Sequence, residues 1–188
     1  MIKKVILYFT NLWYSIIRVG SFRGSENMLS FLSKNKDKDI TVFDIAKFFS
    51  SKQVMSHKKL QKLVYYAYAW YIALYNESVD DINTRLCVDT QFEAWVHGPV
   101  CRKLYNICSD HYGTVPKYDG ELHHLITGEL KSYLENIYDT FGKYTGDELE
   151  SMTHLEMPWQ NARDNLLPSV PSKKIISEAD MFIYYNSL

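Results

Sequence analysis

Apolar residues recur at helical spacing through most of the chain after residue 40. From Ser56 to about Asn76 they fill one stripe and most of the remaining positions, which predicts a central helix that is buried nearly all round. Only the first turn of this helix is polar. We expect solvent to cover that turn, which contains His57, Lys58, Lys59 and Lys62.

Capping patterns mark the starts of further helices. Thr41 with Asp44 and Thr145 with Glu148 have the spacing of a capping box, and Ser177 has the same relation to Asp180. Apolar residues at helical spacing indicate how far these helices extend, and Gly142 follows the end of one of them. The predicted helices are about 42–50, about 128–141, a short one after Thr145, a turn opened by Pro158, and a last one after Ser177.

One segment, Val88–His97, alternates between apolar and polar positions and predicts a strand. Its partner strand is expected within Thr84–Val88 or near Val115–Tyr118. Gly98-Pro99 is expected to end the strand and to begin a helix that runs to about Asp110, because proline suits the first helical position. The fold class is therefore mainly α with a small central β element (α+β), with about six or seven helices and a strand pair.

The N-terminal region, residues 1–39, is expected to be an extension of a domain that covers 40–188. Apolar residues at helical spacing within Met1–Phe22 predict an amphipathic helix, and Ser33–Asp39 reads as a polar linker. Polar interruptions argue against a secretion signal or a membrane span. An alternative is that this region is an upstream extension, translated before a second possible start at Met28. We expect a cytoplasmic protein.

Composition limits the function classes. The chain has 188 residues, a net charge of −1, 46% hydrophobic residues and 23% charged residues, which excludes a disordered chain. The balanced charge disfavours nucleic acid and membrane partners. Three cysteines, none in a CxxC pair, indicate reduced thiols rather than a disulfide framework.

Motifs for catalysis and cofactor binding are missing from the sequence, which has no GxGxxG, Walker loop, HExxH or GxSxG. Two other sites are compatible with the residues present. One is a metal site of Cys101, Cys108 and His111, and the other is a catalytic pair of Cys101 with His154, but neither has a diagnostic spacing. Lys58–Lys62 could belong to a helix-turn-helix, although the helix that follows is too apolar to lie in a groove. We expect no enzyme, cofactor, metal or small-molecule substrate.

The predicted strand and the turn after it form a candidate partner-binding site. Trp95 either covers a second layer of core or, if exposed beside Gly98-Pro99, anchors an interface. The 15 tyrosines of the chain fit surfaces that become buried on binding. The candidate residues are Glu93, Trp95, His97, Gly98 and Pro99.

Three segments in order resemble the Panacea domain, which is the SocA-like antitoxin domain, and its phage-associated GepA-like relatives. They read SHKKLQKLVYYAYAWYIAL at 56–74, FEAWVHGPVCRKLY at 92–105 and THLEMPWQNAR at 153–163. Beside the candidate site residues, the positions that match the pattern and are expected to be structural are Leu60, Leu63, Tyr65, Tyr66, Trp70, Val100, His154, Pro158 and Trp159.

This resemblance implies an antitoxin of a bacterial or prophage toxin–antitoxin system that neutralises a co-encoded protein toxin by direct contact. Some relatives act as adaptors that deliver the toxin to a protease. A phage or mobile-element adaptor that binds host proteins, and a DNA-binding repressor, stay as alternatives. The resemblance implies no catalytic residue.

Overall fold

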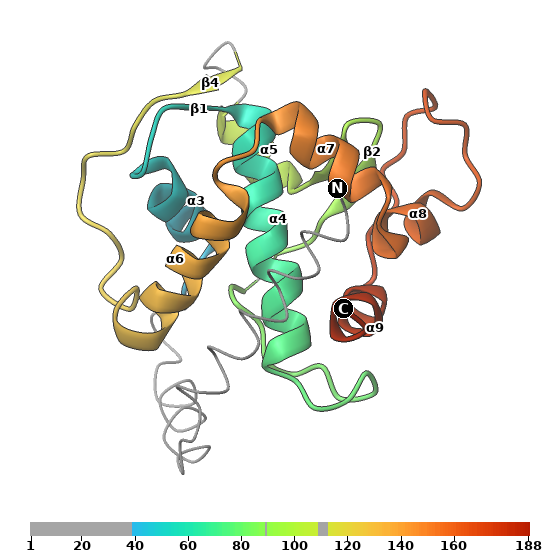
Figure 1. The fold of residues 1–188 in the computed structure, drawn as a ribbon, viewed down its shortest axis with the longest axis horizontal. Coiled ribbons are helices and arrows are strands. Elements are labelled where there is room, and N and C mark those ends of the chain that lie inside the picture. The colour runs from blue at the N-terminus through green and yellow to red at the C-terminus, as the bar shows by residue number, and fades with distance from the viewer. Residues whose placement is uncertain (1–38, 89, 109–112) are drawn as a thin grey trace. The chain divides into compact units, whose positions relative to one another are not determined.

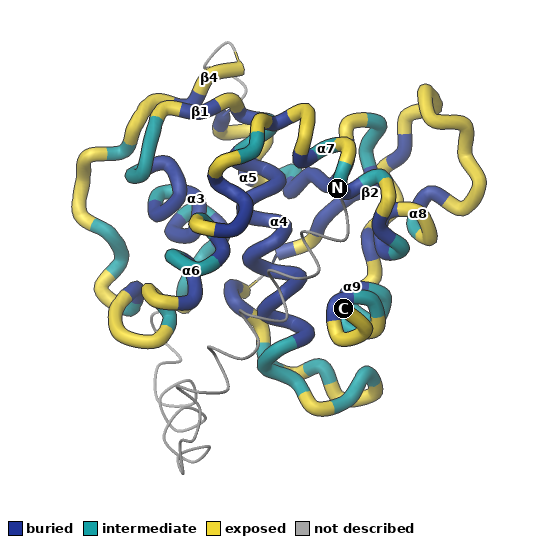
Figure 2. Tube along the Cα trace, viewed as in Figure 1, coloured by how far each residue is buried: buried dark blue, intermediate teal, exposed yellow. Residues whose placement is uncertain are grey.

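The nearly continuous apolar run after Ser56 forms α4 (His57–Leu74), and the other elements pack around it (Figure 1). The computed structural model describes residues 39–88, 90–108 and 113–188, so the amphipathic helix expected within Met1–Phe22 lies outside the described residues. Ile40–Ser187 forms one compact unit. Figure 2 shows α4 buried along most of its length, as a helix that is apolar all round requires.

Six further helices surround α4 in the described part of the chain, which confirms the mainly α prediction. They are α3 (Val42–Ser50), α5 (Arg102–Cys108), α6 (Gly128–Phe141), α7 (Gly146–His154), α8 (Met157–Arg163) and α9 (Glu178–Asn186). Figure 1 shows α3 and α6 on one side of α4 and α9 on the other. None of the helices in the described ranges could cross a membrane.

The predicted caps are present. Thr41 and Asp44 form a capping box at α3, and Thr145 and Glu148 form one at α7, where the Thr145 amide donates to the Glu148 carboxylate at 2.7 Å. The Ser177 hydroxyl accepts from the first-turn amides of α9. These contacts are local, so the sequence spacing alone was enough to place them.

Two short antiparallel pairs make up the β structure of the described residues. β1 (Met55–Ser56) pairs with β4 (Thr114–Val115), and β2 (Glu93–Trp95) pairs with β3 (Gly98–Val100). An isolated bridge joins Ile175 to Glu93, so the chain just before α9 lies against the other edge of β2.

The strand prediction was wrong in extent and in partner. Of Val88–His97 only β2 is a strand, and it pairs with the residues directly after the turn. Gly98-Pro99 begins no helix, because Gly98 has a φ of +87° and turns the chain back into β3. The helix that follows, α5, begins at Arg102. Val115 pairs with Met55 instead.

The expectation of a solvated first turn in α4 was also wrong for two of its residues. His57 and Lys62 are buried, whereas Lys58 and Lys59 are partly exposed. The His57 ring lies 5.1 Å from that of Tyr105 in α5, and burial lowers the pKa of His57. Neighbouring elements therefore cover this turn on one side.

Farther along the helix, α4 packs against α9 around a buried carboxyl group. Glu156, at the start of α8, accepts hydrogen bonds from the Tyr66 hydroxyl at 2.9 Å and from the Tyr185 hydroxyl at 2.7 Å. Burial raises the pKa of Glu156 to about 7. This carboxyl group links α4, α8 and α9.

Candidate partner-binding surface

The β2–β3 hairpin closes through the two-residue turn 96–97, with Trp95 opposite Gly98. The φ of +87° at Gly98 is a value that L side chains rarely adopt. A Cβ atom at this position would lie 2.6 Å from Cε of Lys62 and 2.8 Å from Oγ1 of Thr153. Gly98 is therefore required by the backbone of the turn and by the close approach of α4 and α7.

Lys62 lies in α4 against the hairpin and is 1% exposed. Its Nζ donates to the Pro99 carbonyl at 3.1 Å. Burial lowers the pKa of Lys62 to about 7, although the negative charge of Glu150 acts in the opposite direction. Lysine is rarely buried to this extent, so its position here indicates that α4 and the hairpin are held together at this point.

The C-terminal motif holds the hairpin from another direction. The Trp159 indole N–H donates to the Trp95 carbonyl at 3.1 Å, and the His154 ring stacks on Trp159 at 4.1 Å. The Arg163 guanidinium donates to the Ala94 carbonyl at 3.2 Å. Because α4 supplies the buried lysine, all three motif segments meet at the hairpin.

Trp95 lies half-buried on the outer side of this arrangement. Its indole N–H donates to Glu93 at 2.7 Å, and the Arg102 guanidinium lies 5.3 Å from its ring while donating to the same carboxylate at 2.7 Å. Tyr105 is 38% exposed, and its ring lies 4.8 Å from that of Trp95. Burial opposes ionisation, but the bonds from Arg102 and Trp95 hold the pKa of Glu93 below its usual range. We call Trp95, His97, Arg102 and Tyr105 the hairpin surface.

His97 is at the tip of the hairpin, where its side chain is 69% exposed. Its Nδ1 lies 3.0 Å from one oxygen of Glu150 in α7, and the ammonium group of Lys58 lies 2.6 Å from the other. Burial opposes ionisation of Glu150, but the bonds from Lys58 and His97 lower its pKa. The tip is thus joined directly to α7, and through Glu150 to Lys58 of α4.

The five candidate residues therefore lie in one element with different exposures. The hairpin exposes His97 and part of Trp95, and it buries Glu93, Gly98 and Pro99. Sequence reasoning missed Arg102 and Tyr105. Their spacing of three on a short helix puts them on one face, which is the signal that could have found them once the start of α5 was known.

The positions expected to be structural lie largely in the interior. Only His154 among them is partly exposed, and the buried ones are Leu60, Leu63, Tyr65, Tyr66, Trp70, Val100, Pro158 and Trp159.

The basic turn considered for DNA binding presents no cluster of lysines to a ligand. Lys58 pairs with Asp147 at 2.8 Å, the Lys59 ammonium donates to the Gly142 carbonyl at 2.6 Å, and Lys62 is buried. Each lysine is directed to the protein itself, which counts against a helix-turn-helix at this place.

The thiols lie in the interior. Cys87, Cys101 and Cys108 are free and buried, and burial raises the pKa of Cys87 to about 12. Within the described ranges no group of three or more His, Cys, Asp or Glu residues could hold a metal ion. His111 lies outside those ranges.

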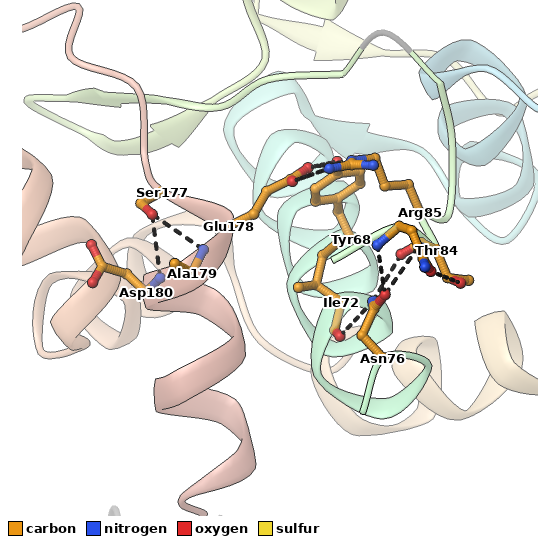
Figure 3. Close-up of polar contacts among 10 residues, drawn as sticks. Tyr68, Ile72, Asn76, Thr84, Arg85, Ser177, Glu178, Ala179 and Asp180 are labelled. Carbon is orange, nitrogen blue, oxygen red and sulfur yellow. Dashed lines mark hydrogen bonds and ion pairs between the residues drawn. The ribbon is translucent and has the colours of Figure 1, made fainter. Parts of the chain in front are cut away.

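A groove of about 1060 Å³ adjoins the hairpin surface and shares Arg102 with it. Tyr68, Arg85 and Glu178 also line it, and Figure 3 shows their polar contacts. The Arg85 guanidinium binds the Glu178 carboxylate with both Nε and Nη2, the latter at 2.7 Å, and the Tyr68 hydroxyl donates to the same carboxylate. This contact fixes the start of α9 to α4 and to the chain before β2.

The described fold and surface define a mainly helical domain with a supported hairpin that presents aromatic and charged side chains. Comparison with family models matches residues 60–160 to the antitoxin SocA-like, Panacea domain family. The match covers more than half of the chain, and the chain belongs to this family. Searches of curated proteins and of solved structures gave no significant match.

Proposed function

We propose that this protein is an antitoxin that neutralises a co-encoded protein toxin by direct binding in the cytoplasm, without catalysis of its own. The observation that carries the proposal is the match to the SocA-like antitoxin family over residues 60–160. That family membership supports an antitoxin role in general, and the mode of neutralisation is our inference from the surface of this chain.

The hairpin surface is the proposed site of toxin contact. Trp, Tyr and Arg are the residues that most often dominate binding energy at protein interfaces, and Trp95, Arg102 and Tyr105 lie together here. The backbone beneath them is held by Lys62 and Trp159. A surface that is ordered before binding loses less conformational entropy when a partner covers it.

Co-expression with the adjacent gene tests the proposal. We expect the neighbour to stop growth when expressed alone, growth to be restored by this chain, and the two proteins to purify as a complex. A toxic neighbour that is neutralised without forming a complex would contradict direct binding. A neighbour without toxicity, and no toxic protein neutralised by the chain, would contradict the antitoxin role.

The Trp95→Ala substitution tests the surface. We expect binding to weaken at least about tenfold, because hot-spot truncations cost about 2 kcal/mol or more. Tyr118→Ala is the matched control, since this partly buried tyrosine lies between β4 and α6 with contacts to Ser50 and Glu121. Titration calorimetry measures affinity, and thermal unfolding measures stability. Equal losses of affinity and stability would favour a core role for Trp95.

A further inference from the structure

A buried glutamine of α4 holds the junction between the hairpin and α5. Gln61 is 2% exposed, and its side-chain amide binds both backbone groups of Cys101, the residue between β3 and α5. Its Oε1 accepts from the Cys101 N–H at 2.8 Å, and its Nε2 donates to the Cys101 carbonyl at 3.3 Å. One side chain of α4 therefore fixes the backbone of this residue at two points.

The same carbonyl is the first hydrogen-bond acceptor of α5. The Tyr105 N–H donates to the Cys101 carbonyl at 2.9 Å, which closes the first turn of that helix. The helix has only 7 residues, Arg102–Cys108, and a helix of that length is not stable on its own. The direction in which α5 leaves the hairpin therefore depends on where this first acceptor is held.

That direction decides how the helical part of the hairpin surface meets the part on β2. Arg102 and Tyr105 lie on α5, and both contact Trp95. The Arg102 guanidinium is 5.3 Å from the Trp95 ring, and the Tyr105 ring is 4.8 Å from it. A shift of α5 relative to β2 would separate these side chains even if each stayed exposed. Gln61 itself is buried, so its influence on binding is exerted through the backbone of Cys101.

A second residue of α4 holds the Gln61 amide in one orientation. Because its oxygen accepts from the Cys101 N–H, its nitrogen faces His57, and the two Nε2 atoms are 3.1 Å apart. An amide nitrogen can only donate, so the His57 ring accepts at Nε2 and is neutral, with its proton on Nδ1. Burial, together with the positive charge of Lys62, lowers the pKa of His57 and favours this form. The amide is therefore fixed before any partner binds.

We propose that Gln61 is a positioning residue for toxin binding, which acts through the backbone of Cys101. By holding that residue it aligns Arg102 and Tyr105 with Trp95. This inference rests on the proposed function and deepens it. Parts of a surface that are aligned in advance lose less conformational entropy on binding. Without the amide, the buried N–H of Cys101 has lost its acceptor, and the start of α5 must move to satisfy it.

Removal of the amide tests the inference with the full chain and the purified co-encoded toxin. Gln61→Met keeps a side chain of similar length and loses both bonds to Cys101. Tyr133→Phe is the matched control, because it also removes a buried hydrogen bond to the backbone, from the Tyr133 hydroxyl of α6 to the Ala67 carbonyl of α4. By titration calorimetry of the folded proteins, we expect Gln61→Met to weaken binding at least about fivefold and Tyr133→Phe less than about twofold. Equal effects of the two variants would overturn the positioning role.

A double-mutant cycle tests whether Gln61 acts through α5. If Gln61 aligns Tyr105, removal of that ring also removes part of what Gln61→Met can lose. We expect the factor by which Gln61→Met weakens binding to be at least about two times smaller in a Tyr105→Ala background than in the wild-type background. Where Gln61→Met does not fold, Gln61→Glu enters the same cycle, because it keeps an acceptor for the Cys101 N–H and loses the donor to the carbonyl. The same factor in both backgrounds would overturn the proposal, since a merely structural residue affects both equally.

The wild-type chain separates this inference from the proposed function. A chain that binds the toxin but shows independent effects of the substitutions at Gln61 and Tyr105 contradicts the positioning role and leaves the antitoxin role in place. A wild-type chain that binds no toxin contradicts both.

Discussion

Two ionisable side chains are buried along α4, Lys62 of the helix itself and Glu156 at the start of α8, and their two sites are built differently. Toward the hairpin, Lys62 donates to the Pro99 carbonyl at 3.1 Å. Toward α9, Glu156 accepts from two phenol hydroxyls, those of Tyr66 and Tyr185, at 2.9 and 2.7 Å. One site joins a side chain to a backbone carbonyl, and the other joins three side chains from three helices.

Burial acts on both groups in the direction that removes charge. It lowers the pKa of Lys62 to about 7 and raises that of Glu156 to about 7. Near neutral pH, Lys62 and Glu156 are therefore each only partly ionised, so neither site holds a full charge in the interior. Protonation linkage gives the two sites opposite effects on stability, which separates them experimentally.

The largest expected effect comes from Gly98→Ala, on the hairpin side. The new Cβ would lie 2.6 Å from Lys62 Cε, and φ is +87°, so we expect a loss of about 3–5 kcal/mol of unfolding free energy. Gly113→Ala is the control, because Gly113 has a φ of +79° but nothing within 4 Å of the new atom. It should cost about 1 kcal/mol. Similar losses in denaturant titrations of both variants would show that the contact with Lys62 is unimportant.

The next effect is the pH dependence contributed by Glu156. Its folded pKa of about 7 is above the usual 4.5, so the folded state binds more protons and stability falls as pH rises through this range. We expect the difference in unfolding free energy between wild type and Glu156→Gln to fall by roughly 3 kcal/mol from pH 4.5 to 8. The difference is the useful quantity, because burial also lowers the pKa values of His57 and of the partly exposed His154, which adds a pH dependence shared by both proteins. A flat difference would contradict the neutral carboxyl group.

A smaller effect of opposite sign is expected for Lys62. Its folded pKa of about 7 is below the usual 10.5, so the unfolded state binds more protons above pH 7 and stability rises with pH. Relative to Lys62→Met, the wild type should gain about 2 kcal/mol between pH 6 and 8.5. Chemical unfolding of the two proteins at a series of pH values measures this gain. A gain that is absent would place the charge of Lys62 in contact with solvent.

The elements that could be predicted from sequence depend on neighbours close along the chain. The capping boxes of α3 and α7 join residues three apart, and the buried α4 follows from its own apolar pattern. Their formation needs no knowledge of distant segments.

The hairpin and the burial of Lys62 could not be predicted from neighbours close along the chain. In the sequence, Lys62 follows Lys58 and Lys59 and precedes the apolar run, which is the pattern of a solvated first turn. Its burial depends on Gly98 and Pro99, which lie more than 30 residues later. The same Gly98-Pro99 dipeptide is compatible with a helix start and with a turn into β3. Only the space available between α4 and α7 decides between them.

The attachment of the hairpin to its surroundings also bears on how its binding could be reproduced outside the protein. A two-stranded hairpin alone is at best marginally stable in water. Here the carbonyls of residues 94, 95 and 99 accept bonds from Arg163 and Trp159 of α8 and from Lys62 of α4. A synthetic peptide of residues 93–100 would lack all three donors, so it would be a poor mimic of the surface. A transplanted binding site would have to carry α4 and α8 with it.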